Sequence, residues 1–445
     1  MSGWLKDRVF RTVLKNAGYL GSTKLIGALI GLGALIGAGR MLTPVEFGTL
    51  MLIHTYALGV GALTKFQSWQ MILKFGARPY EQGNRNIVMK AIRFAVGLDM
   101  ASGVFGMIVG MAILFFAASF VGIGPQYTPI ALLYCTLVPT MSSATPTGVL
   151  RLVGRFDLIA RQQIVTPLLR GLGTLVAWLF GLGFTSFVAS WYIADIAGDL
   201  VLWLMTVKEL RERDMQSSLR PSLRSAPSAL PGVWNFVWLT NLNTTLDACW
   251  SPVGNLIVGG ILGPAAAGRY KIATTLLDSA IKPARFLEKG FYPEIMRLDP
   301  KSRHPWHLAV RTGLLSGGIG LCLMLAILIG GKPLISLFGH KYAEASTLMT
   351  LMSPALVISM SCFPLESLLY MAGQAKAVLV AQIISVVTYI TALVCLTHSF
   401  GLHGAGISYI LGVFLLNILA MIPAIIGYTR RHLLESETIQ SEIPN

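Results

Sequence analysis

Charge is scarce in this sequence. Only 12% of the 445 residues are Asp, Glu, Lys or Arg, whereas 54% are hydrophobic. A soluble domain typically carries about 25% charged residues, so this chain has too little charge to cover a globular surface in water. The composition therefore excludes an ordinary soluble globular protein.

Several functional signals are missing as well. The five cysteines lie in apolar blocks and form no Cys-x-x-Cys pair, which argues against a disulfide framework or a metal site. There is no Gly-x-x-x-x-Gly-Lys-[Ser/Thr] phosphate loop, so a primary pump is not expected. The outer connections are short, and His340, His398 and His403 are scattered. We therefore expect a protein that is not an enzyme, with no cofactor and no metal.

Long apolar blocks dominate what the sequence does contain. A bilayer core about 30 Å thick is crossed by about 20 residues of helix, and the blocks lack the alternation of barrel strands. They therefore predict an all-α integral membrane protein of about twelve transmembrane helices. The blocks lie at approximately 19–39, 47–63, 94–123, 129–150, 164–184, 185–206, 233–262, 265–284, 308–330, 346–372, 375–397 and 402–428.

The placement of basic residues predicts the orientation. Most of the 35 Lys and Arg residues lie before the first block or after the even-numbered blocks, which places both termini in the cytoplasm. The net charge of +15 then reflects membrane orientation, and nucleic acid is not an expected partner. The domains expected are a six-helix lobe at 1–207, a cytoplasmic linker at 208–230, a second lobe at 231–431 and a disordered cytoplasmic tail at 432–445.

The second half of the chain echoes the first. The outer turn Met41–Gly48 matches Ile261–Gly268, and at the same shift Lys65-Phe66 matches Arg285-Phe286. Six helices per half is an even number, so both halves insert the same way up. We expect two parallel six-helix bundles around a central cavity, as in secondary transporters; a duplicated scaffold is the alternative.

Four segments resemble one known family. They are Gly39–Leu50 (GRMLTPVEFGTL), Val149–Ala160, Leu256–Tyr270 and Phe291–Ile295. Together they are similar to the polysaccharide transporter family, the O-antigen and capsule flippases of the multidrug/oligosaccharidyl-lipid/polysaccharide exporter superfamily. The family often has an acidic residue where this chain has Asn255.

This resemblance implies a function and a location. The expected substrate is an oligosaccharide linked to polyprenyl pyrophosphate, moved by alternating access across the bacterial cytoplasmic (inner) membrane for O-antigen, capsule or exopolysaccharide synthesis. Membrane lipid is a further expected partner. A multidrug or cation antiporter of the same fold, and a membrane-bound polymerase or glycosyltransferase, are the alternatives.

Basic residues inside apolar blocks are candidates for binding the anionic head group, because ionisable residues in a membrane are usually functional. Lys24 lies in the first predicted helix, Arg170 in the fifth and Lys271 in the eighth. Each can meet the pyrophosphate; Lys24 and Arg170 can instead reach the cytoplasmic interface with their long side chains.

Polar residues recur every four positions in the seventh predicted helix. Asn243, Asp247, Ser251 and Asn255 would share one face of a regular α-helix. That stripe faces either the substrate cavity or another helix.

Buried acids are candidates for coupling transport to H⁺ or Na⁺, because burial and proximity raise a carboxyl pKa. Asp195 and Asp199 share a helix face, and they can alternatively pair with a base such as Arg170. The candidates are Asp99, Asp195, Asp199, Asp278 and Glu366.

Glycines in the first predicted helix have Gly-x-x-x-Gly spacing. They are Gly27, Gly31, Gly33 and Gly37. This spacing predicts close helix packing.

Overall fold

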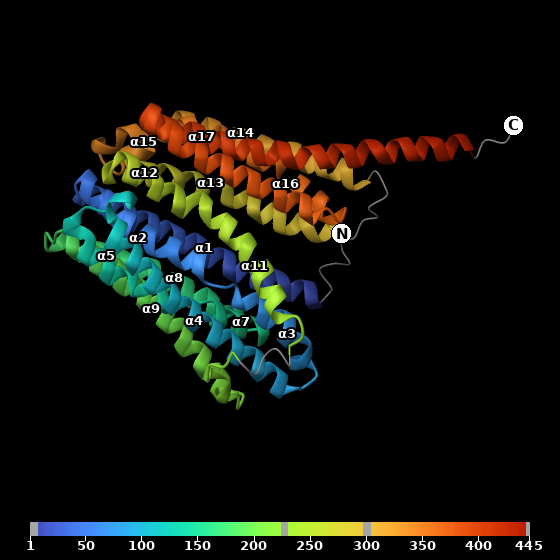
Figure 1. Cartoon of the computed structure of the whole chain (residues 1–445), viewed down its shortest axis with the longest axis horizontal. Coiled ribbons are helices and arrows are strands. Elements are labelled where there is room, and N and C mark those ends of the chain that lie inside the picture. Colours follow the sequence, from blue (N-terminus) through green and yellow to red (C-terminus); the bar gives the residue numbers. More distant parts are fainter. Residues whose placement is uncertain (1–7, 142, 224–229, 297–303, 442–445) are drawn as a thin grey trace. The chain divides into compact units, whose positions relative to one another are not determined.

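The structure is a computed structural model that describes residues 8–141, 143–223, 230–296 and 304–441. Within these ranges every regular element is a helix and none is a strand (Figure 1). The all-helical class predicted from the sequence is confirmed.

Contacts divide the chain into two compact units, Met1–Ala248 and Cys249–Asn445. The helices of the first unit are α1 (Arg8–Met41), α2 (Pro44–Thr64), α3 (Ser68–Glu81), α4 (Arg85–Ala117), α5 (Thr128–Cys135), α6 (Leu137–Thr140), α7 (Ala144–Leu152), α8 (Phe156–Leu179), α9 (Phe184–Glu212) and α11 (Val233–Ala248), with short 3₁₀ helices η2 (Ala118–Val121), η3 (Pro125–Tyr127) and η4 (Gln216–Leu219). Helices α1, α8 and α9 pack in that order, and α2 packs on α4 (Figure 1).

The second unit begins inside the seventh predicted helix. Its elements are the π-helical η5 (Cys249–Val253), α12 (Gly254–Leu262), α13 (Pro264–Met296), α14 (His304–Ser336), the 3₁₀ helix η6 (His340–Tyr342), α15 (Ala343–Met352), α16 (Pro354–Met371) and α17 (Ala375–Ser441). Within this unit α14 packs on α16, and α16 on α17.

Each predicted block coincides with a helix or a run of helices. Seven stretches of the described chain are long and apolar enough to cross a membrane. One of them, Lys376–Gly427, covers the last two predicted blocks. Gly401 divides it, because its φ of 58° and ψ of −138° are not helical. Val378 and Ala424, from the two arms, share one buried cluster, so the arms fold back on each other.

The two turns that match in the internal repeat, Met41–Gly48 and Ile261–Gly268, begin their helices in different ways. Thr43 caps α2: its hydroxyl accepts from the N–H of Glu46 at 3.3 Å, and its own N–H donates to the Glu46 carboxylate at 2.9 Å. This reciprocal capping satisfies amides that an α-helix leaves unpaired. In the second half Gly263, with φ of 86°, makes the turn that leads into Pro264 of α13.

Three sequence expectations need correction. The connection after the second block contains a helix, α3, which hydropathy misses because it is short and only one face, with Met71 and Ile72, is buried. Residues 432–441, expected to be disordered, continue α17; no Gly or Pro interrupts them, and extending an existing helix needs no new nucleus. Helix seven is not one regular α-helix, because η5 interrupts it.

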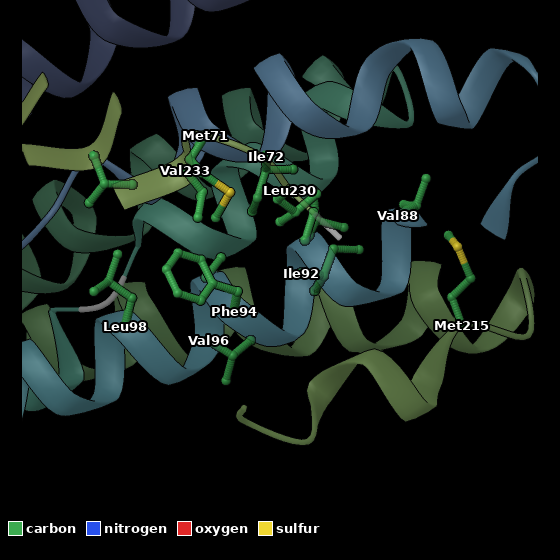
Figure 2. Close-up of a cluster of buried hydrophobic side chains, with 14 of the residues drawn as sticks. Met71, Ile72, Val88, Ile92, Phe94, Val96, Leu98, Met215, Leu230 and Val233 are labelled. Carbon is green, nitrogen blue, oxygen red and sulfur yellow. The ribbon is translucent and has the colours of Figure 1, made fainter. Parts of the chain in front are cut away.

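Described parts of the segment expected to be a linker at 208–230 pack against helices of the first unit. Ser222 donates its N–H to the Arg93 carbonyl at 3.2 Å, and the Arg93 side chain bonds the Ser217 carbonyl at 3.1 Å. Leu230 and Val233 are buried in the same cluster as Ile72 of α3 (Figure 2). By contact α11 also belongs to the first unit; a lobe boundary at 208–230 stays a prediction.

Candidate functional site

A cavity of about 530 Å³ lies within the first unit, where α2 ends and where the run of helices from α5 to α7 is broken. Lys65, Phe66 and Gln67 line it from the connection between α2 and α3, and Met141 and Ser143 line it from the break between α6 and α7. Asp99, Asp195 and Asp199 line it as well, so it is a charged and polar space within this unit.

Lys65 is the cationic residue of this cavity. It follows the last residue of α2 in an extended conformation, and its Cε lies 3.5 Å from where a Cβ on Gly103 of α4 would be. The side chain therefore lies against α4, one turn from Asp99. Among the residues that the structure describes, none hydrogen-bonds the buried Nζ. A buried unpaired charge is costly, and the attraction of Asp99 and Asp199 offsets part of that cost.

Asp99 is held by hydroxyl and amide donors from two neighbouring helices. Its side chain is almost completely buried, with 2% of the residue exposed. Thr145 donates both its N–H, at 3.0 Å, and its hydroxyl, at 2.7 Å, to Oδ2, and the Ser68 hydroxyl donates to Oδ1. These bonds fix the carboxyl group at the wall of the cavity and join α4 to α3 and α7.

Asp195 on α9 belongs to a network that joins four helices. The Arg170 guanidinium of α8 donates to Oδ1 at 2.5 Å, and Tyr134 of α5 donates to Oδ2 at 3.5 Å. Arg170 also contacts His54 Nε2 of α2 at 3.3 Å and lies over the Trp191 ring, 4.4 Å from its centre. Arg170 and Asp195 are thus paired, as one of the sequence interpretations anticipated.

The bonds around His54 indicate which ring nitrogen carries the proton in the neutral form. Arg170 can only donate, so Nε2 of His54 must accept. The proton of the neutral ring is then on Nδ1, which donates to the Tyr134 hydroxyl at 3.0 Å. The Tyr134 hydroxyl in turn donates its own hydrogen bond to Asp195. Protonating the ring would place two donors against each other at Nε2, while Nδ1 lies 3.6 Å from Oδ2 of Asp195.

Asp199 lies one turn after Asp195 on the same face of α9, and both line the cavity together with Thr166 of α8. The face predicted from their spacing is present in the structure. One cavity therefore brings together three of the predicted acids, with Arg170 bonded behind Asp195.

The remaining predicted residues lie elsewhere. Lys24 is on an exposed face of α1, and Lys271, Asp278 and Glu366 are half-buried in the second unit. They do not line the cavity of the first unit. Their predicted roles in substrate binding and coupling stay predictions.

The polar stripe predicted for helix seven crosses a π-helical segment, and its role stays a prediction. Ser251 lies in the π-helical segment η5 and Asn255 in α12, where it is 1% exposed. A π-helical turn holds an extra residue, and a four-residue spacing across it still returns to nearly the same face. The side chains of Asn243 and Asp247 lie outside the described residues.

Aromatic side chains surround η5 in the second unit. Trp250 stacks on Tyr389 with ring centres 4.7 Å apart and meets Tyr409 edge-on at 6.3 Å. The Tyr389 hydroxyl lies 3.0 Å from that of Tyr270 and donates to the Trp250 carbonyl at 3.3 Å. The cluster therefore braces a segment that lacks regular α-helical bonding.

Sequence reasoning missed Lys65, His54 and Tyr134. Lys65 stands at the end of an apolar block, where a basic residue indicates membrane orientation, and it is also part of the internal repeat. Neither signal indicates a role in binding. His54 is an ionisable residue within an apolar block, and that signal alone could have identified it. Among the described residues, no group of three or more His, Cys, Asp or Glu is placed to hold a metal ion.

Comparison with solved structures identifies the fold. An inward-facing multidrug resistance MATE family transporter of the MOP superfamily superposes with a TM-score of 0.72, at 14% identity, over 94% of this chain and 99% of that one. The lipid II flippase MurJ, in an inward closed conformation, superposes with a TM-score of 0.69, at 10% identity, over 96% of this chain and 93% of that one. The twelve-helix transporter fold is thereby confirmed.

Sequence comparison identifies the family. Residues 13–233 match the family described as polysaccharide biosynthesis protein. The inner membrane protein YghQ of Escherichia coli strain K12 is 44% identical over 347 residues, which cover 78% of this chain and 98% of that protein. The chain, an integral membrane protein with a transporter fold, therefore belongs to the polysaccharide biosynthesis protein family.

Proposed function

We propose that this protein is a flippase of the bacterial cytoplasmic membrane. It moves an oligosaccharide linked to polyprenyl pyrophosphate from the cytoplasmic to the outer face by alternating access, and both termini are cytoplasmic. The observation that carries this proposal is the charged cavity in the first unit, lined by Lys65, Asp99, Asp195 and Asp199. The family and the fold support it.

The chemistry of the substrate explains why such a cavity is needed. A sugar head group with a pyrophosphate is hydrated and anionic, and moving it through hydrocarbon without polar contacts is prohibitively costly. Lys65 supplies a cation for phosphate oxygens. Gln67, Ser143 and Thr147 supply hydrogen-bonding groups that suit sugar hydroxyls.

The network of His54, Arg170 and Asp195 beside the cavity provides a means of coupling to H⁺. Protonation of His54 would oppose two donors at Nε2 and so break its contact with Arg170. Arg170 would then keep only Asp195 and the Trp191 ring, and α2 would lose a bond to α8. A proton thus changes the contacts between helices, which is what a coupling ion must do. Na⁺, which prefers carboxylate oxygens, is the alternative coupling ion.

A second function has support from specific observations. Three carboxylates in one cavity also suit an organic cation, and the MATE transporter has a high fold similarity to this chain. A multidrug antiporter would need no contact with phosphate, so Lys65 discriminates between the two functions. A flippase needs this cation, whereas a cation exporter is hindered by it.

The test uses a strain from which the gene is deleted. We expect lipid-linked oligosaccharide to accumulate in the membrane fraction, measured by mass spectrometry, and surface polysaccharide to fall. The wild-type gene should restore both. Lys65→Met and Asp99→Asn should each reduce export at least about tenfold, the equivalent of about 1.4 kcal/mol.

Matched controls separate loss of transport from loss of protein. Lys208→Met and Glu344→Gln change exposed residues that lie outside the cavity, with side chains 77% and 67% exposed, and should export normally. Immunoblots of membranes should show equal amounts of all variants. Unchanged precursor levels in the deletion strain would refute the flippase, and sensitivity to cationic dyes in that strain would favour the antiporter.

A further inference from the structure

A second cavity of the first unit lies between α1 and α8. Its volume is about 640 Å³. We call it the α1–α8 groove, and its principal lining residues are Gly33, Gly37, Arg40, Gly171, Thr174 and Trp178.

Glycines determine the shape of the groove. A Cβ on Gly37 would meet Thr174 Cγ2 at 2.5 Å, and one on Gly171 would meet Ile30 Cγ2 at 3.2 Å, so the two helices touch at these points. A Cβ on Gly33 would meet nothing within 4 Å. Gly33 is therefore not needed for helix packing, and its missing side chain keeps the groove open.

The surroundings of the groove are apolar and exposed. Leu29 is 62% exposed, Leu175 49% and Trp178 65%. In a membrane-spanning chain, exposed side chains of this kind face lipid. Arg40 lies at the C-terminal end of α1 beside Trp178 of α8, and such a pair is typical of the level of the lipid head groups.

Thr174 adds a polar group to the groove, one helical turn before Trp178 on α8. The residue is 8% exposed, and among the described residues its buried hydroxyl has no hydrogen-bond partner. A hydroxyl buried in this way needs an acceptor. A phosphoester oxygen held near Arg40 would supply one.

We infer that the α1–α8 groove binds a polyprenyl phosphate, with its chain along Gly33 and its phosphate at Arg40 and Thr174. The groove runs between only two helices and has one lining cation, which suits one chain and one phosphate group. Phospholipids carry two chains. This inference rests on the proposed function, because that function brings a polyprenyl carrier to the protein, and it assigns the carrier a docking site at the outer end of α1.

The test measures binding of undecaprenyl phosphate to the purified full-length protein by native mass spectrometry. Wild type should retain one molecule. Gly33→Leu fills the groove and should weaken binding at least about tenfold, while the better helix propensity of Leu keeps α1 stable. The matched control is Gly318→Leu, another exposed helical glycine with nothing within 4 Å, which should bind normally.

Two further variants test the phosphate end. Arg40→Gln and Thr174→Val should weaken binding of undecaprenyl phosphate by about tenfold and about threefold, but leave binding of undecaprenol unchanged. Equal loss for both lipids would contradict a phosphate site. Melting temperatures equal to that of wild type show that each variant is folded.

Competition decides which lipid the groove selects. Phosphatidylglycerol and inorganic phosphate should each fail to displace undecaprenyl phosphate at equal concentration. Equal displacement by phosphatidylglycerol would show a site for bulk lipid and overturn the inference, as would normal binding by Gly33→Leu. The proposed function is tested separately, because it depends on the level of lipid-linked oligosaccharide in the deletion strain and not on lipid binding by the purified protein.

Discussion

The two units differ in where they place charge. In the first unit α4 carries Asp99, and α9 carries Asp195 and Asp199. In the second unit α14 has no Asp, Glu, Lys or Arg between Arg311 and Lys332, and α17 has none between Lys376 and Arg430. Its polar groups include tyrosine hydroxyls around Trp250.

This difference separates two tasks within a repeated architecture. Buried charges respond to H⁺ and to anions, whereas buried aromatic rings and hydroxyls mainly fix geometry. The comparison therefore predicts that removing a charge around the cavity of the first unit costs more stability than disturbing the aromatic cluster of the second. Three substitutions test it by the stability of the purified protein.

The largest effect is expected for Asp195→Asn. It leaves Arg170 buried without a carboxylate, which costs about 3–5 kcal/mol of unfolding free energy. The measurement is thermal unfolding in detergent, followed by tryptophan fluorescence. The matched change in the second unit is Glu344→Gln, whose pair with Arg269 is largely exposed and should cost less than about 1 kcal/mol.

A double variant sharpens this first result. Replacing both Arg170 and Asp195 by Leu removes the unpaired charge and should recover most of the stability. Transport should stay absent if these charges serve coupling. Normal transport in the double variant would assign the pair a structural role only.

An intermediate effect is expected for Glu209→Gln in the first unit. The Glu209 side chain is 4% exposed and bonds Arg155 and also Arg213, the latter at 2.5 Å. Loss of these charged bonds should cost about 1.5–3 kcal/mol. Glu212→Gln is the control, because its pair with Lys208 is exposed and spans 4.0 Å; equal losses in both variants would contradict the structure.

The smallest effect is expected in the second unit, for Gly412→Ala. The new Cβ would lie 2.8 Å from the Trp250 ring and 2.9 Å from Tyr389, and such overpacking should cost about 1–2 kcal/mol. Gly427→Ala has nothing within 4 Å and should be neutral or slightly stabilising. A loss larger than that of Asp195→Asn would reverse the ranking of the two units.

Hydropathy was enough to predict the spans and the class of the fold. It works because every transmembrane helix must meet the same length and polarity requirement. The rule that intramembrane charge is functional also identified Asp99, Asp195 and Asp199, which the structure gathers around one cavity.

The partners of these acids could not be predicted from the sequence. Lys65 lies at the end of α2, and only the extended backbone there and the absence of a side chain at Gly103 bring it beside α4. The bonds from His54 and Tyr134 depend on how α2, α5, α8 and α9 pack, which periodicity does not specify. The π-helical segment of helix seven was also not predictable, since no rule of spacing anticipates it.

That segment has a consequence for genetics. Cys249–Val253 gives helix seven one residue more than an α-helix of the same length needs. An in-frame deletion of one codon there would remove the extra residue and leave the facing of Asn255 nearly unchanged, whereas a deletion of one codon within α11 would turn it by about 100° about the helix axis. Single-codon deletions along this helix would then separate a change of facing from a change of composition, which point substitutions cannot do.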